Sequence, residues 1–227
     1  MSFQPTPVDN ALDWLRANAD PAVLESMGTR YGIHTKRALG VPMNKMKALG
    51  KQLGTDHDLA AELWSTGWYE ARIVASMVDD PEAVTSEQMD SWVEEFDNWA
   101  IVDTVCFNLF DRTRHAWDKV DQWADRKEEF VKRTAFALLW SLTGHDAEAP
   151  ETRFLHGLEL IEREAGDGRP LVDKAIGMAL RAIGKRRRGL RSAALEVAER
   201  LAASDHPAVR KIGRPAVREL AGRDATN

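Results

Sequence analysis

The sequence predicts an all-α protein built from stacked pairs of antiparallel helices. Three observations support this fold class. Apolar residues recur at spacings of three and four through most of the 227-residue chain, which is typical of amphipathic helices. No segment alternates apolar and polar residues as a strand does. Similar helical segments also recur at spacings near 40 residues. We expect a single domain over residues 1–227 with flexible ends at residues 1–8 and 222–227.

The predicted helical segments follow one another along the chain, separated by clusters of Gly, Pro and Asp. They span residues 56–78, 85–110, 127–142, 151–164, 171–183 and 190–203. The breaks lie at residues 79–81, 144–150, 166–170 and 204–207. Thr85 is a good N-cap because Gln88 follows three residues later. Pro207 suits the first turn of a further helix.

The composition excludes several classes of protein. No run of about 18 apolar residues exists, so we expect no membrane span. Residues 1–20 lack the basic and then apolar layout of a signal peptide, and Cys106 is the single cysteine, so the cytoplasm is the expected compartment. No histidines show metal-ligand spacing and no glycine-rich phosphate loop is present, so we expect neither a metal nor a cofactor. Nothing demands more than a monomer.

Charge is unevenly distributed along this acidic chain of net charge −5. Residues 1–110 carry a net charge of −9, whereas residues 111–227 carry +4. The densest basic run is residues 185–188. Such asymmetry permits a face that binds polyanions. A solvated loop between two helices is an equally good interpretation of the run.

An internal repeat places a basic residue near the start of successive helices. The spacings between these residues are 61, 41 and 37, and the longer gap leaves room for a further helix pair. Periods of about 40 residues built from helix pairs are typical of HEAT-like repeats. Such repeats stack into a curved solenoid whose second helices line the concave face. A plain helical bundle is the alternative, and the period favours the solenoid. The concave positions would be Arg72, Asp103, Arg133, Lys174 and Lys211.

The most informative local pattern is Trp99 followed four residues later by Asp103. On a helix, this spacing places an indole and a carboxylate on the same face. The pattern alone favours a structural interpretation, with Trp99 in the core and Asp103 paired with Arg133 or Arg72. The other interpretation is a site that handles a flat or cationic substrate.

Several segments, taken in order and spacing, resemble the AlkD-like DNA alkylation repair family. The resemblance covers about residues 31–185, and its carriers are Tyr31, residues 38–42, 62–64, 69–72, 96–103, 130–133 and 174–181. It implies a HEAT-like solenoid with DNA N-glycosylase activity on duplex DNA that contains alkylated bases. It also implies that the damaged base is not flipped into a pocket, unlike in most enzymes that modify bases.

The resemblance assigns roles to particular residues. Asp103 matches the catalytic carboxylate, Trp99 the tryptophan that packs on the sugar of the damaged nucleotide, and Arg133 an active-site arginine. Tyr31 matches a tyrosine that faces the lesion, although it is also interpretable as an ordinary surface aromatic. Met178 falls where the family has a second tryptophan. Methionine is apolar and adaptable but offers no indole face, which puts the range of lesions in doubt.

The chemistry suits these residue types. An N3- or N7-alkylated purine is cationic and a good leaving group, and its departure develops oxocarbenium character on the sugar. A carboxylate stabilises that charge and can orient water. Lys174 is not assigned a Schiff-base role in the family, so we expect a monofunctional enzyme. Phosphate contacts are expected from Arg72, Lys174, Arg181, Lys185 and Lys211.

Two other functions stay open. Met178 in place of the family's second tryptophan, together with the net negative charge, fits a non-enzymatic HEAT-like protein that binds branched or damaged DNA. Concave solenoids also commonly bind peptides, so a protein–protein scaffold is the third possibility.

Overall fold

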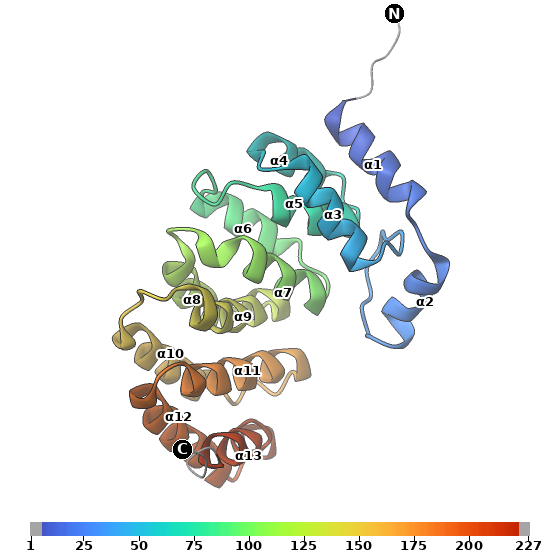
Figure 1. Cartoon of the computed structure of the whole chain (residues 1–227). Helices are drawn as coiled ribbons and strands as arrows, with labels where there is room; N and C mark the ends of the chain where they lie inside the picture. Colours follow the sequence, from blue (N-terminus) through green and yellow to red (C-terminus); the bar gives the residue numbers. More distant parts are fainter. Residues whose placement is uncertain (1–5, 223–227) are drawn as a thin grey trace, which may run out of the picture. The chain divides into compact units, whose positions relative to one another are not determined.

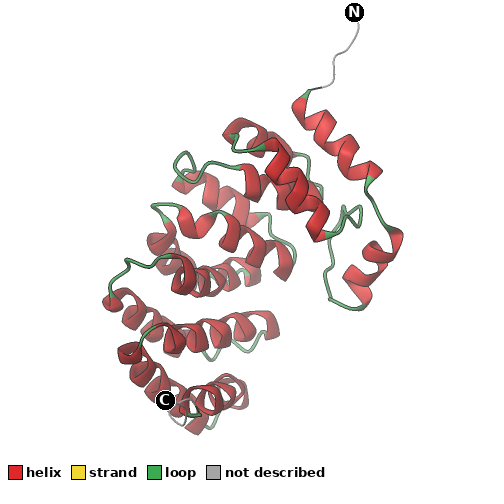
Figure 2. Cartoon of the chain, viewed as in Figure 1, coloured by secondary structure: helices red, strands yellow, loops and turns green. Residues whose placement is uncertain are grey.

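The computed structural model describes residues 6–222. These residues form thirteen α-helices and one 3₁₀ turn (η1, Phe110–Arg112), and they contain no strand (Figure 2). The all-α prediction is therefore confirmed. The chain divides between Thr113 and Arg114 into two compact units. The single domain expected from the sequence stays a prediction, because two compact units can belong to one domain. Most of the ends expected to be flexible lie outside the described residues, and Pro7 and Val8 belong to the first helix.

The described part of the first unit, residues 6–113, contains seven α-helices. They are α1 (Pro7–Ala17), α2 (Pro21–Thr29), α3 (Met43–Leu53), α4 (His57–Ser65), α5 (Tyr69–Val78), α6 (Ser86–Glu94) and α7 (Trp99–Asn108). Helix α5 packs between α3 and α7, so these three helices form one layer (Figure 1). Helix α1 packs against α4 and α5.

Residues 114–222 of the second unit form three consecutive helix pairs. The helices are α8 (Ala116–Ala124), α9 (Glu129–His145), α10 (Glu151–Glu164), α11 (Pro170–Arg186), α12 (Arg188–Ala203) and α13 (Pro207–Ala221). The first helices of the pairs pack in the order α8, α10, α12, and the second helices in the order α9, α11, α13 (Figure 1). This two-layer stacking of helix pairs is the HEAT-like arrangement that the repeat period predicts.

The predicted segments in the second unit agree closely with α9 to α12, and α13 begins at Pro207 as expected. Two predictions in the first unit were wrong, because residues 56–78 and 85–110 each hold two helices. Gly67, at a φ of 71°, makes the turn between α4 and α5. Asn98 interrupts the second long segment, because it caps a new helix that begins at Trp99. The helix pair expected in the long gap between repeats is α6 and α7.

Aromatic side chains form much of the core of the first unit. The rings of Trp64 and Trp92 are stacked with their centroids 3.9 Å apart and an interplanar angle of 4°. Phe96 and Phe110 extend this cluster, their ring centroids 6.3 Å apart. Such stacking adds about 0.5–1.5 kcal/mol per pair beyond the burial of area. The cluster therefore fixes the segment that leads into α7.

Arginine side chains cap the carboxyl ends of five helices from outside those helices. The last carbonyls of a helix have no partner within it, and they carry the negative end of its dipole. A guanidinium satisfies both needs at once, and we call these contacts arginine clasps. The clasps join Arg37 to Thr66, Arg72 to Trp64 and Glu95, Arg186 to Thr143 and Asp146, Arg191 to Leu220, and Arg210 to Ser204.

Candidate nucleic-acid interface and catalytic residues

The start of α7 presents Trp99 and Asp103 on one helix face. Asn98 caps the helix, its side-chain oxygen accepting the N–H groups of Ala100 and Ile101 at 3.0 Å each. Trp99 is then the first helical residue and Asp103 lies one turn later. Both residues are partly exposed to solvent. Neither residue is therefore sealed in the core.

The loop after α2 holds the indole of Trp99 in place. The indole Nε1–H of Trp99 donates to the backbone carbonyl of Tyr31 at 3.0 Å. The hydroxyl of Thr35 donates to the Asp97 carboxylate at 2.9 Å, two residues before Trp99. Tyr31 is 49% exposed, and the Arg30 guanidinium lies 5.3 Å from the centre of its ring. The structure therefore brings together Tyr31 and Trp99, which are 68 residues apart in sequence.

The same loop is anchored to α5 by a buried carboxylate. Glu70 is fully buried and accepts the N–H groups of Leu39 and Gly40 at 3.0 and 2.7 Å. Gly40 has a φ of 80°, and a Cβ on it would lie 2.5 Å from the Asp20 carbonyl oxygen, so only glycine fits this turn. Burial raises the pKa of the neighbouring Tyr69, as do the Glu70 and Asp97 carboxylates. The two sequence pieces at residues 38–42 and 69–72 thus form one support for the loop.

Arg72 is committed to contacts within the first unit. Its Nε and Nη1 donate to the Trp64 and Glu95 carbonyls at 3.3 Å each, and Nη2 pairs with the Glu95 carboxylate. Its guanidinium lies over the Trp64 ring, 4.9 Å from the centre. This arrangement links α4, α5 and α6. The role of Arg72 in binding DNA stays a prediction, and a phosphate would have to compete with these partners.

Arg133 lies in the interior of the second unit, with 1% of its surface exposed. Its Nη1 donates to the Leu171 carbonyl at 2.6 Å, which ties α9 to the start of α11. The active-site role of Arg133 stays a prediction. Any influence on a reacting group would be exerted from a buried position.

A groove between α11 and α13 brings together three of the predicted phosphate contacts. Lys174, Arg181 and Lys211 all line a cavity of about 350 Å³. Met178, half-buried, lies on α11 one turn after Lys174. Arg181 Nε lies 3.0 Å from Glu219 Oε2, and Lys185 pairs with the other oxygen of the same carboxylate. Lys185 is therefore joined to the same surface through Glu219.

Two residues of the basic run at 185–188 have a structural role that the sequence did not reveal. Arg186 Nη1 donates to the Thr143 carbonyl at 2.5 Å, and Arg187 donates to the Ala147 carbonyl at 3.0 Å. Arg186 also lies 4.4 Å from the centre of the Phe154 ring. Burial lowers the pKa of Arg186, and the neighbouring Arg187 adds to this effect. Arg186 and Arg187 therefore fasten the end of α9 and the turn after it.

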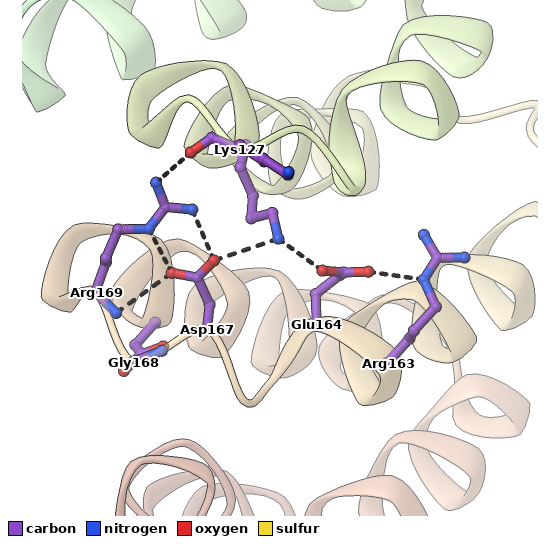
Figure 3. A network of polar contacts seen from close by, with 8 residues as sticks. Lys127, Arg163, Glu164, Asp167, Gly168 and Arg169 are labelled. Carbon is purple, nitrogen blue, oxygen red and sulfur yellow. Dashed lines mark hydrogen bonds and ion pairs between the residues drawn. The ribbon is translucent and has the colours of Figure 1, made fainter.

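A network of ion pairs holds the α10–α11 turn beside this groove (Figure 3). Lys132 Nζ lies 2.7 Å from Glu164 Oε2 and 3.2 Å from Asp167 Oδ2, and all three side chains are largely buried. Arg169 binds both oxygens of Asp167 at 2.7 Å and donates to the Lys127 carbonyl. The Arg169 guanidinium holds the pKa of Asp167 at about 2, with Lys132 adding to the effect. The turn that carries Gly168 into the groove is thus fixed at several points.

Within residues 6–222, no helix is long and apolar enough to cross a membrane. The same residues hold no group of three or more His, Cys, Asp or Glu side chains placed to bind a metal ion. Cys106 is buried.

The family model described as DNA alkylation repair enzyme matches residues 11–221. No curated protein matches the chain. A solved structure superposes with a TM-score of 0.77 at 21% identity, covering 96% of this chain and 97% of its own. That protein is described as belonging to a new family related to the HEAT-like repeat DNA glycosylases, with affinity for branched DNA structures.

Proposed function

The chain belongs to the DNA alkylation repair enzyme family, and from this premise we propose that it is a monofunctional DNA N-glycosylase. The proposed substrate is duplex DNA carrying purines alkylated at N3 or N7, whose cationic bases are released without being flipped into a pocket. The observation that carries the proposal is the partly exposed face of α7, where Trp99 and Asp103 lie one turn apart and the Trp99 indole is held by the Tyr31 carbonyl.

In the proposed reaction, the bond between the sugar and the cationic base breaks before water attacks the sugar. The base leaves with the bonding electrons and becomes neutral, while positive charge builds on the deoxyribose. The Asp103 carboxylate stabilises that charge and orients a water molecule for attack. The face of the Trp99 indole adds a cation–π contribution of about 0.5–2 kcal/mol. Its fixed orientation means that little ordering is needed when substrate binds.

The other residues have proposed roles in binding DNA or in the reaction. Tyr31 would face the lesion, and Arg133 would serve as an active-site arginine. Met178 would contact the damaged nucleotide without an indole face, which narrows the lesions that are held well. The five cationic residues expected to contact phosphates, Arg72, Lys174, Arg181, Lys185 and Lys211, would supply affinity that falls with salt.

The test measures release of 7-methylguanine from methylated duplex DNA under single-turnover conditions. We expect release by the wild type and a loss of at least about 100-fold in Asp103→Asn, since removing one electrostatic stabiliser typically costs this much. Asp118→Asn makes the same change at an exposed position on α8 and serves as the matched control. Circular dichroism checks that each variant folds. No release by the wild type at high enzyme concentration would falsify the proposal.

A second candidate is a non-enzymatic protein that binds branched or damaged DNA. Met178 in place of tryptophan favours it, and the affinity for branched DNA described for the structural neighbour is consistent with it. Tight binding of four-way junctions without base release would support this function. Failure to bind any DNA at low salt would favour a protein–protein scaffold, because phosphate contacts strengthen as salt falls.

A further inference from the structure

The α11–α13 groove has an excess of positive charge along its walls. Three cationic side chains line it, those of Lys174, Arg181 and Lys211, against one carboxylate, that of Asp173. The Asp173 carboxylate accepts the N–H of Gly168 at 3.1 Å, so it is also engaged in fixing the turn before α11. An anion entering the groove therefore meets more attraction than repulsion.

The shape of the groove suits a small anionic group. Its volume of about 350 Å³ lies at the low end of the range for ligand sites. Gly177 forms part of its wall, and a Cβ there would lie 3.2 Å from Nη1 of Arg181. The absence of that side chain keeps the space between the two helices open. Ion-pairing groups around such a space fit a phosphate better than a neutral base.

Glu219 forms ion pairs with two of the cationic side chains on this surface. It lies on α13, whereas both of its partners, Arg181 and Lys185, lie on α11. Each of its oxygens pairs with a different cation, as two oxygens of a phosphodiester could do. The pairs are partly exposed, with side-chain exposures of 26% for Arg181 and 37% for both Lys185 and Glu219. Partly exposed ion pairs exchange partners at a small cost in free energy.

We propose that the α11–α13 groove binds a backbone phosphate of DNA and that Glu219 competes with DNA phosphate for Arg181 and Lys185. Glu219 is thus an internal substitute for phosphate that weakens binding of the nucleic acid. This inference rests on DNA being the partner, as in the proposed function, but it does not depend on base release. It assigns to the carboxylate a role opposite to that of its cationic neighbours.

The experiment compares duplex binding by the wild type and E219Q, with unmodified DNA at several salt concentrations. The substitution keeps the shape of the side chain and removes its charge. We expect E219Q to bind about 3–10-fold more tightly at moderate salt. The slope of log K against log salt should become steeper by about 0.9 for each phosphate gained. In K211Q the slope should become shallower by a similar amount.

E162Q is the matched control for net charge. Glu162 on α10 pairs through both oxygens with Arg200 on α12, at 2.6 and 2.9 Å, so this variant also removes one carboxylate that bridges two helices. Neither residue lines the groove. We expect E162Q to bind DNA nearly as the wild type does.

The possible outcomes separate this inference from the proposed function. Equal gains in E219Q and E162Q would show an effect of net charge alone and overturn the inference. Unchanged binding in E219Q would also overturn it. Absence of duplex binding by both wild type and E219Q at low salt would overturn the inference together with the DNA partner. Tighter binding by E219Q without any release of 7-methylguanine would support the inference while the glycosylase proposal fails.

Discussion

Replacing Gly213 by alanine should destabilise the protein, although this exchange normally stabilises a helix. Gly213 lies inside α13, where alanine is favoured over glycine by about 1 kcal/mol on intrinsic propensity. A Cβ at this position would, however, lie 2.3 Å from the backbone nitrogen of Ala202 and 2.7 Å from the carbonyl oxygen of Ala198. These are backbone atoms of α12, so no side-chain rotation relieves the contact.

The expected magnitude follows from comparing these two effects. Carbon atoms pack at about 3.5–4 Å, so α12 and α13 would have to separate by about 1 Å at this crossing. Such overpacking costs about 1–3 kcal/mol, and more where the backbone must shift. After the gain in helix propensity, we expect a net loss of about 2 kcal/mol. With a urea dependence of about 3 kcal/mol/M, the midpoint of unfolding would fall by about 0.7 M.

Urea unfolding followed by circular dichroism measures this shift. Gly144→Ala is the control, because Gly144 lies in α9 and a Cβ there would meet nothing within 4 Å. We expect that variant to be more stable than the wild type by up to about 1 kcal/mol. A Gly213→Ala protein that is as stable as Gly144→Ala would refute the close approach of α12 and α13.

Two further predictions concern charged residues of the second unit. Arg186→Gln should lower the free energy of unfolding by about 1–3 kcal/mol, because carbonyls at the end of α9 lose their donor. The control, Arg188→Gln, changes an exposed arginine and should alter that free energy by less than about 0.5 kcal/mol. Equal urea midpoints for the two variants would contradict this prediction. The pKa of Asp167 is about 2 in the folded state and 3.8 as a free side chain, so its contribution, on the order of 2 kcal/mol, is present above pH 3.8 and is lost as the pH falls toward 2. The Asp167→Asn variant should lose less stability than the wild type as the pH falls from 3.8 toward 2. If the urea midpoints of the variant and the wild type depended on pH in the same way, this prediction would be contradicted.

Much of the fold follows from the sequence because helical periodicity is a local signal. It predicted α9 to α12 to within a few residues, since these helices are long and Gly and Pro clusters separate α9 from α10 and α10 from α11. It failed where breaks are short. The turn at residues 66–68 depends on one glycine, and the apolar spacing continues through it. Four short helices, α1, α2, α3 and α8, were not predicted, since their 9 to 11 residues offer few repeats of the pattern.

The candidate site could be predicted only in part. The spacing of Trp99 and Asp103 correctly placed both on one helix face, because that relation is local. The partner of Trp99 could not be found this way, because it is a backbone carbonyl 68 residues away, and a carbonyl has no sequence signature. Glu219 was missed for a similar reason, since its partners on α11 lie more than 30 residues earlier. The burial of Arg133 depends on packing between α9 and α11, which the residue type does not reveal.

The arginine clasps have a consequence for chemical labelling of this protein. A reagent that modifies guanidinium groups would convert the donors at five helix ends, and its first effect would be to loosen the helices. A reagent that acetylates amines would instead reach exposed Lys174 and Lys211 while leaving those helix ends intact. Loss of DNA binding after arginine modification would therefore say little about the interface. Protection of lysines from acetylation by bound DNA would map it directly.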